Sequence, residues 1–439
     1  MLKQVKTLNP KLYSPRLYVM ADVDTSSEYK INEVERELEK VYKSKSVTVK
    51  IPRSRIFQKY IMPLKGIKVL ELAGLAPAPF CGAILADFGA SVIKIDRVSS
   101  SSEADCMTNG KKSLALNLKD NRGRDIFLRL SSKADVLIEP FRRGVMENLG
   151  LGPEVLTKLY PKLIYARLTG FGQTGPYSDM AGHDINFLSL SGVLSFLGRA
   201  EEKPVPPVNL LADFGGGGLT CALGIVLALL ERSNSGKGQV IDCSMVEGAA
   251  YLSSWLFRSQ NLPIWGQKRG QNVLDTGTHF YETYETADGR FVSVGALESQ
   301  FYDILVKKLK LPELESQWSD FESKKKVLAK VFKTKTRDEW CEMFDFTDAC
   351  VTPVLDVAEV TEHAHNKERE TFIKLGQGVV APKPAPRLSR TTGISKANLP
   401  AVENGEHSEE ILREIGYSSF EIHEFEKEGV IKSTKLSKL

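Results

Sequence analysis

The sequence lacks most of the short motifs that indicate a reaction mechanism. Its 439 residues contain no GxxxxGK[ST] phosphate-binding loop, no GxGxxG turn after a first strand and no GxSxG nucleophile elbow. The six cysteines form no CxxC pair, which indicates a reducing compartment and favours neither a disulfide framework nor a metal site. The longest apolar stretch, Leu219 to Leu230, is shorter than the ~20 residues of a membrane-spanning helix. It predicts a buried helix, and we expect no transmembrane segment and no bound metal.

The chain also lacks a strong excess of charge of one sign. Residues 1–61 carry 13 Lys and Arg against 7 Asp and Glu, whereas the remainder carries 46 against 48. The body of the chain therefore has no basic field for nucleic acid, although a local basic site for a phosphorylated ligand is compatible with these totals. Residues 1–61 contain no strong core segment and too many acidic residues for a mitochondrial transit peptide. We expect them to be a flexible extension before a start at Met62, with a genuine accessory segment as the alternative.

From residue 64 onward, strand patterns alternate with helix patterns. Strand-like segments such as "GIKVLEL", "SVIKIDR", "DVLIEPF" and "LIYARLTGFG" are separated by helical patterns such as "APAPFCGAILADFG". This alternation predicts parallel βαβ units and a doubly wound sheet. After about residue 246 the pattern changes to a hairpin with an Asp-Gly turn, "HFYETYETADGRFVSVGAL", followed by helices. We predict an α/β fold, with a large domain on a doubly wound, mostly parallel sheet and a smaller α+β domain.

These patterns divide the chain into six predicted segments. They are the extension (1–61), the first part of the large domain (62–245), a linker (246–275), the small domain (276–375), a return to the large domain (376–432) and a tail (433–439). The Pro-rich "VVAPKPAPRLSR" is expected to be a connector. The tail ends in Ser437, Lys438 and Leu439, a tripeptide that the peroxisomal import receptor recognises at a C-terminus. We expect a peroxisomal location, with the mitochondrion as a second one, and an uninformative tail is the alternative reading.

Histidine is scarce, and one of the six histidines begins an apolar helical pattern. His183 and Asp184 precede "INFLSLSGVLSFLG", and Asp213 opens the long helix predicted from "NLLADFGGGGL". A histidine at a helix N-terminus is kept neutral by the helix dipole and is then available as a base. The plainer alternatives stay open, namely a hydrogen-bonded structural histidine and helix caps for the two aspartates. The glycines after Asp213 indicate a helix that packs close to another backbone.

Longer motifs carry a family resemblance when they are taken together. They are "ELAGLAPAPFCGAILADFGASVIKIDR", "EPFRRGVMENLGLGPE", "LIYARLTGFGQTGPYSDMAGHDIN", "NLLADFGGGGL", "GKGQVIDCSMVEG", "VGALESQFYDIL" and "TDACVTPVL". In this order, from about residue 62 to 439, they resemble the α-methylacyl-CoA racemases of the family III CoA-transferase superfamily. The resemblance also favours Met62 as the start. It implies an interlocked homodimer, in which each active site lies between the CoA-binding large domain of one subunit and the small domain of the other.

The resemblance further implies a role for individual residues. His183 and Asp213 would be the two catalytic acid/bases, and Glu298 of the small domain would pair with the histidine. The CoA-binding residues would be Arg97, Leu116, Asn117, Leu118, Lys119 and Arg142, and the acyl thioester would contact Gly182, Asp184, Ile185, Asn186 and Phe187. No metal and no separate cofactor are implied, because CoA is part of the substrate.

The implied reaction is epimerisation at C2 of 2-methyl-branched acyl-CoA thioesters, both fatty acyl-CoA and bile-acid intermediates. Two acid/bases on opposite faces of C2 suit it, because one removes the α-proton and the other delivers a proton to the enolate. Asp213 must then hold a proton near neutral pH, which requires a raised pKa.

Two other functions stay open at this point. In a family III CoA transferase Asp213 would act as a nucleophile, but such an enzyme has no need of His183. A non-catalytic acyl-CoA binder would not need the full set of ionisable residues. Phe187, where relatives often have tyrosine, and Thr276 and Thr278 depart from the usual pattern and leave the acyl preference open. His279 beside them is a minor candidate for the entrance of the site.

Overall fold

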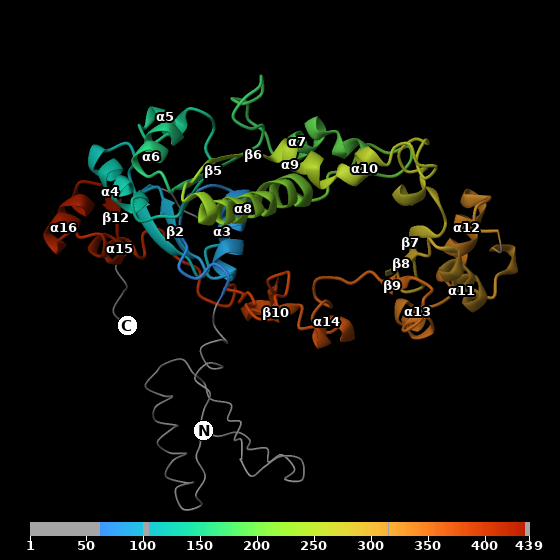
Figure 1. Ribbon diagram of the computed structural model, residues 1–439. Helices are drawn as coiled ribbons and strands as arrows, with labels where there is room; N and C mark the ends of the chain where they lie inside the picture. Colours follow the sequence, from blue (N-terminus) through green and yellow to red (C-terminus); the bar gives the residue numbers. More distant parts are fainter. Residues whose placement is uncertain (1–61, 100–104, 315, 435–439) are drawn as a thin grey trace, which may run out of the picture. The chain divides into compact units, whose positions relative to one another are not determined.

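The computed structural model describes residues 62–99, 105–314 and 316–434. Its main feature is a seven-stranded sheet with the order β12-β3-β2-β1-β4-β5-β6 (Figure 1). The strands are β1 (Lys68–Leu72), β2 (Ser91–Asp96), β3 (Lys112–Leu116), β4 (Val136–Glu139), β5 (Ile164–Thr169), β6 (Val240–Ser244) and β12 (Ile431–Lys432). All pairs in this sheet are parallel except β12 with β3. The doubly wound, mostly parallel sheet is therefore confirmed.

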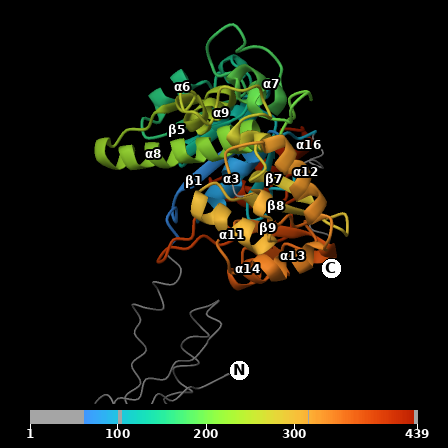
Figure 2. The same cartoon turned by 90° about the vertical axis from the view of Figure 1, so that its right-hand side faces the viewer.

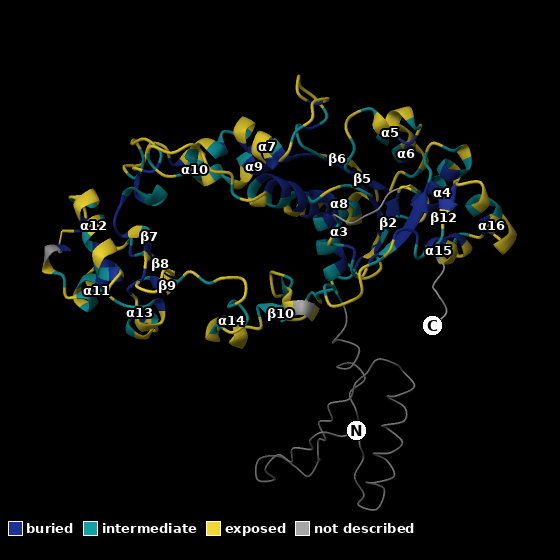
Figure 3. Ribbon diagram, turned by 180° about the vertical axis from the view of Figure 1, so that it is seen from behind, coloured by how far each residue is buried: buried dark blue, intermediate teal, exposed yellow. Residues whose placement is uncertain are grey.

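Helices cover both faces of this sheet, because its strands are apolar on both sides. Successive residues such as Val69 and Leu70 in β1 belong to two separate hydrophobic cores, and the strands are the buried centre of the fold (Figure 3). The first core includes residues of α3 (Pro77–Asp87), α7 (Asp184–Ser191), α8 (Thr220–Ser235) and α9 (Met245–Leu252). The second includes residues of α4 (Asn121–Ser131), α5 (Val145–Asn148), α6 (Pro153–Leu159), α15 (Ser408–Glu414) and α16 (Ser419–Lys427).

A π-helix, η3 (Leu210–Leu219), runs directly into α8. One side of α8 lies in the first core through Cys221, Ala222, Ile225 and Ala228. The combined helix of 26 residues is long and apolar enough to cross a membrane by length and composition alone, a test that core helices of soluble proteins also pass. The helical run is thus longer than the stretch Leu219 to Leu230 that stands out in the sequence. Two short helices, η2 (Val193–Phe196) and α10 (Ser254–Arg258), lie before and after this region of the chain.

A third hydrophobic core is formed within residues 273–351. It surrounds an antiparallel sheet of β7 (Tyr281–Glu285), β8 (Phe291–Gly295) and β9 (Val351–Pro353), with α11 (Ser299–Leu309), α12 (Phe321–Phe332) and α13 (Arg337–Phe344) packed around it (Figure 2). Short helices η4 (Val273–Gly277) and η5 (Pro312–Leu314) complete this part, which we term the small domain. The predicted Asp-Gly hairpin is confirmed as β7 and β8. The third strand, β9, was not expected, because it is only three residues long.

The segment after the small domain contains a ribbon of two short strands. Within the Pro-rich connector, β11 (Val380–Pro382) pairs antiparallel with β10 (Phe372–Lys374). Proline is tolerated there because it occupies the end of a two-stranded ribbon. The helices α14 (Ala364–Glu368) and η6 (Gly376–Gly378) lie nearby in the chain. Beyond α16, β12 returns to the edge of the large sheet, with Ile431 opposite Leu116.

The domain boundaries drawn from the sequence stay a prediction. The expected extension at 1–61 and the C-terminal tripeptide lie outside the described residues.

Candidate active site

The predicted CoA-binding residues lie along the edge of the large sheet that is formed by the carboxyl ends of its parallel strands. Arg97 follows β2, residues 116–119 end and follow β3, and Arg142 lies in the loop after β4. The strands β3, β2, β1 and β4 are adjacent and parallel, so their carboxyl ends share this edge. The strand order reverses between β1 and β4, and ligands of doubly wound sheets bind at such a switch point. Neighbouring strands lie about 4.8 Å apart, so the predicted CoA-binding residues between β3 and β4 span about 14 Å along this edge.

Three cations at this edge are available to an anionic ligand. Arg97, Lys119 and Arg142 are exposed, and their side chains form no ion pair with any residue in 62–99, 105–314 or 316–434. The Arg97 guanidinium lies 5.9 Å from the centre of the Phe141 ring, within the range of a cation–π contact. Asn117 shapes the turn, because its side-chain oxygen accepts a hydrogen bond from the Lys119 N–H at 3.1 Å. Exposed guanidinium and ammonium groups of this kind suit the phosphates of CoA.

His183 is the N-cap of α7 and is exposed to solvent. Its backbone N–H donates to the side-chain oxygen of Asn186 at 3.0 Å. Its carbonyl oxygen accepts from the N–H groups of Asn186 and Phe187, at 2.8 and 3.2 Å. These bonds fix the backbone of His183 at the start of the helix.

Asp184 connects α7 to the π-helix. Its buried carboxylate oxygen Oδ2 accepts hydrogen bonds from the backbone N–H groups of Ala212 and Asp213, both at 2.9 Å. Asp184 is therefore not a cap of its own helix, one of the plainer readings of the sequence, but binds the free N–H groups at the start of η3. Nor is Asp213 an N-cap, because Asn209 holds that position.

The surroundings of Asp213 favour its protonated form. Only 8% of this residue is exposed. Burial and the nearby charge of Asp184 raise the pKa of the Asp213 carboxyl above its usual value, against smaller opposing effects of Asn209 and His183. The carboxyl is thus suited to hold and release a proton.

Asn209 is a site residue that the sequence analysis missed. Its side-chain amide donates to Asp213 Oδ2 at 3.1 Å. The backbone of Asn209 has φ of 62°, a left-handed conformation that asparagine tolerates better than most residues. The spacing of four residues before Asp213 was the available signal, since such pairs face each other along a helix.

The glycines after Asp213 let η3 touch another backbone, as expected. A Cβ at Gly216 would lie 2.4 Å from the Ala249 nitrogen, and a Cβ at Gly248 would lie 1.9 Å from the Gly216 oxygen. Both distances are too short for any side chain, so η3 and α9 are in direct backbone contact. This packing holds the turn that carries Asp213 in place. π-Helices are rare and are often found at functional sites.

The segment 182–187 contains both exposed and buried side chains. Ile185 and Asn186 are exposed, whereas Phe187 is only 5% exposed and packs edge to face on Phe171 with ring centres 5.0 Å apart. Within the described chain, the N–H groups of Asp184 and Ile185 donate to no acceptor. Two backbone donors therefore remain free beside His183, which is where a developing negative charge could be stabilised.

Glu298 is the N-cap of α11 in the small domain and is exposed. Among the described residues, no hydrogen bond or ion pair joins it to His183. The pairing of Glu298 with His183 across two subunits stays a prediction.

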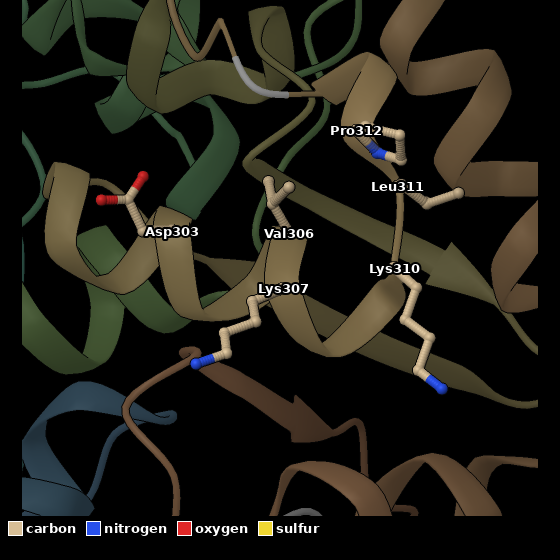
Figure 4. A pocket seen from close by; sticks show the side chains of 6 residues that line it. All are labelled: Asp303, Val306, Lys307, Lys310, Leu311 and Pro312. Atoms are coloured by element: carbon tan, nitrogen blue, oxygen red, sulfur yellow. The ribbon is translucent and has the colours of Figure 1, made fainter.

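A cavity of about 630 Å³ lies toward the other end of α11 (Figure 4). Its lining consists of Asp303, Val306, Lys307, Lys310, Leu311 and Pro312, and includes none of the predicted site residues. The cavity is therefore not a candidate for the reaction centre.

His279 does not lie at a site entrance. It is fully buried in the small domain, with Nε2 2.7 Å from the Tyr302 hydroxyl. Because that hydroxyl donates to the Leu314 carbonyl oxygen, Nε2 is the donor to Tyr302. Burial lowers the pKa of His279 to about 4. The residue therefore serves the core of the small domain.

Comparison with known proteins identifies the family of the chain. The pattern of CoA-transferase family III matches residues 64–408. The α-methylacyl-CoA racemases of mouse and human are 57% and 55% identical over 85% of this chain and 99% of their own length. The structure of a CaiB/BaiF family protein from Brucella suis superimposes with a TM-score of 0.68 at 26% identity, covering 81% of this chain and 99% of that one. The chain belongs to CoA-transferase family III.

Proposed function

We propose that the protein is an α-methylacyl-CoA racemase that epimerises C2 of 2-methyl-branched acyl-CoA thioesters. The observation that carries this proposal is the attachment of Asp184 to the backbone of Asp213, which sets a buried carboxyl with a raised pKa beside the helix that begins at His183. The names of the relatives at 55–57% identity support the same reaction.

The reaction needs two groups that exchange protons with one carbon. In one direction the neutral imidazole of His183 takes the C2 proton, the C2–H electron pair moves toward the thioester carbonyl, and an enolate forms. The Asp213 carboxyl then gives its proton to C2 from the opposite face, and the configuration is inverted. In the other direction the Asp213 carboxylate accepts the proton and the imidazolium of His183 donates. Glu298 of the partner subunit's small domain would orient and stabilise that imidazolium.

The enolate oxygen needs hydrogen-bond donors that are not already in use. The N–H groups of Ala212 and Asp213 lie near the proposed acid, but they already donate to Asp184. The free N–H groups of Asp184 and Ile185 at the start of α7 are better suited, since the helix dipole adds to their effect.

Two features of the site support the proposed substrate class. The cations at the edge of the sheet, Arg97, Lys119 and Arg142, would bind the phosphates of CoA, and the exposed side chains of segment 182–187 would contact the acyl thioester. Both branched fatty acyl-CoA and bile-acid intermediates are proposed substrates. We assign no cofactor, because the chemistry uses only protons held by the chain.

A homodimer and a peroxisomal location belong to the same proposal. The outer side of η3 and α8 exposes Leu219, Leu223, Leu227 and Leu230 at helical spacing, an apolar face that supports contact with a second copy. The C-terminal Ser437, Lys438 and Leu439 support peroxisomal import by the receptor that recognises this tripeptide. The mitochondrion is a second proposed location.

A chiral assay separates this proposal from its alternative. The full-length protein is incubated with one epimer of a 2-methylacyl-CoA, with and without an added free carboxylic acid. A racemase produces the other epimer whether or not the acid is present. Transfer of CoA to the acid without inversion would instead identify a CoA transferase that uses Asp213 as a nucleophile.

A further inference from the structure

A buried ion-pair network lies directly behind the loop that carries Arg142. Glu139, the last residue of β4, is fully buried, and Arg167 of β5, its neighbour in the sheet register, is 5% exposed. Arg167 Nε donates to Glu139 Oε2 at 2.9 Å. The two terminal nitrogens of Arg167 donate to the two carboxylate oxygens of Glu147 in α5, at 2.7 and 3.3 Å.

The two carboxylates stand at the two ends of one loop. Residues 140–144 connect β4 to α5, with Glu139 before the loop and Glu147 beyond it. Arg167 therefore bridges both ends with a single planar group, which only the forked donors of arginine allow. The second oxygen of Glu139, Oε1, accepts the Phe141 N–H at 2.7 Å and fixes the start of the loop as well.

The loop in turn holds residues placed at the proposed CoA site. The ring of Phe141 lies under the guanidinium of Arg97, and Arg142 follows it at the same edge of the sheet. A buried ion pair is a poor source of stability, because the desolvation of its charges offsets most of their attraction. An arrangement of three charged groups around one loop is better explained by the geometry that it imposes on the loop.

We propose that Arg167 is a positioning residue for CoA: by bridging Glu139 and Glu147 it fixes loop 140–144, so that Phe141 and Arg142 are held in place for the nucleotide part of the substrate. This inference rests on the proposed function, since it assigns CoA to this edge. Arg167 itself does not touch the substrate in this account.

The test compares substrates with and without the nucleotide. Full-length wild type, Arg167→Lys and Arg167→Met are assayed with a 2-methylacyl-CoA and with the corresponding pantetheine thioester, which lacks the nucleotide. We expect KM for the CoA ester to rise on the order of tenfold, the effect of one lost charge-assisted hydrogen bond, with kcat changed little. KM for the pantetheine ester should stay unchanged. Lysine keeps the charge but cannot bridge both carboxylates, so it should not restore CoA binding.

A matched control removes a similar ion pair far from the loop in the sequence. Arg337, also 5% exposed, donates to both oxygens of Glu359 at 2.8 and 2.7 Å. Arg337→Met should affect the two thioesters alike. If the Arg167 substitutions raise KM for both esters alike, or for neither ester, Arg167 has only a structural role and the inference is overturned.

Two further measurements test the role of Arg167 if the protein is not a racemase or if the Arg167 variants do not fold. Calorimetric titration with free CoA reports on the loop even if the wild type proves not to be a racemase, and equal affinity for wild type and Arg167→Lys would overturn the inference. Should the Arg167 variants fail to fold, Glu147→Gln removes only the partly exposed half of the bridge. It should weaken CoA binding in the same sense, and unchanged affinity would contradict the account.

Discussion

The carboxylate of Asp184 accepts the backbone N–H of Asp213 at 2.9 Å, across 29 residues of sequence. This bond joins the helix that begins at His183 to the π-helix that carries the second proposed acid/base. It also sets a negative charge near the Asp213 carboxyl, which helps to raise the pKa of that group. One contact therefore serves both the position and the protonation of Asp213.

Removing the charge of Asp184 should shift the pH profile. In Asp184→Asn the amide oxygen still accepts both N–H groups, but the pKa of Asp213 falls because the neighbouring charge is gone. Less Asp213 is then protonated at neutral pH. In the direction in which Asp213 donates, we expect kcat to fall on the order of tenfold, less than the loss of about 10²–10⁴-fold in rate when a general acid is removed altogether. The alkaline limb of the pH profile of kcat should move to lower pH.

Asn209→Gly is the matched variant, because it should change the pKa of Asp213 in the opposite direction. It keeps a residue that accepts the left-handed backbone but removes the amide that lowers the pKa of Asp213. The alkaline limb should move to higher pH. Shifts of both variants in the same direction would contradict this account of Asp213.

The contact between η3 and α9 should tolerate no added methyl group. Gly216→Ala places a Cβ 2.4 Å from the Ala249 nitrogen, so we expect a loss of about 1–3 kcal/mol in the free energy of unfolding. Gly224→Ala in α8 is the control, because its nearest atom outside the helix would be 3.5 Å away. It should be neutral or stabilise by up to about 1 kcal/mol. Urea unfolding of both variants measures the difference, and equal stabilities would argue against backbone contact.

The stability of the fold should decline as pH rises toward neutrality, and the buried carboxyl of Glu71 should contribute to this decline. Glu71 is fully buried beside Lys111, and burial raises its pKa to about 7, above 4.5 for the free side chain. The folded state therefore binds a proton that the unfolded state has lost between these two values, so this contribution is complete below about pH 4.5 and disappears as pH rises through 7. Unfolding midpoints from pH 5 to 8 should show this decline.

The double variant Glu71→Gln/Lys111→Met tests the assignment. It removes the titrating carboxyl of Glu71 together with the buried ammonium of Lys111, so its pH dependence should be flatter over the same range than that of the wild type. An unchanged slope would assign the dependence to other groups.

The apolar face of α8 should control the oligomeric state. Leu223→Lys and Leu227→Lys place charges on two residues that are 54% and 56% exposed in one chain. If this face is covered by a second copy, light scattering should show a monomer for the variants and a dimer for the wild type. Val357→Lys, at a residue 72% exposed, is the control and should leave the dimer intact. Dimers in all four proteins would contradict the proposed role of α8.

Much of the fold could be predicted because parallel strands leave a strong local signal. Segments such as "DVLIEPF" are apolar on both faces, and β4 is buried throughout. By contrast, β3 and β12 were not predicted from the sequence. The apolar part of β3 is short and is flanked in the sequence by lysines and polar residues, and β12 has only two residues. Their place in the sheet depends on partners distant in sequence, which no local pattern records.

The site could be predicted only in part, for a similar reason. The family resemblance supplied His183, Asp213 and Glu298, and it also supplied the cations Arg97, Lys119 and Arg142 at the edge of the sheet. The contact of Asp184 with Ala212 and Asp213 joins distant segments, and the sequence offered only a helix cap as an open alternative for Asp184. The π-helical backbone was also not predictable, because the residues "LLADFGGGGL" suit an α-helix equally well.

The most direct test of the account follows hydrogen at C2. Each epimer of a 2-methylacyl-CoA is incubated in heavy water with wild type, His183→Ala and Asp213→Asn, and deuterium at C2 is measured together with configuration. The account predicts deuterium incorporation with inversion by the wild type. Each variant should lose inversion of both epimers, while any exchange that remains should be confined to the epimer whose proton faces the surviving base. Inversion without deuterium, or full activity of His183→Ala, would contradict proton transfer between His183 and Asp213.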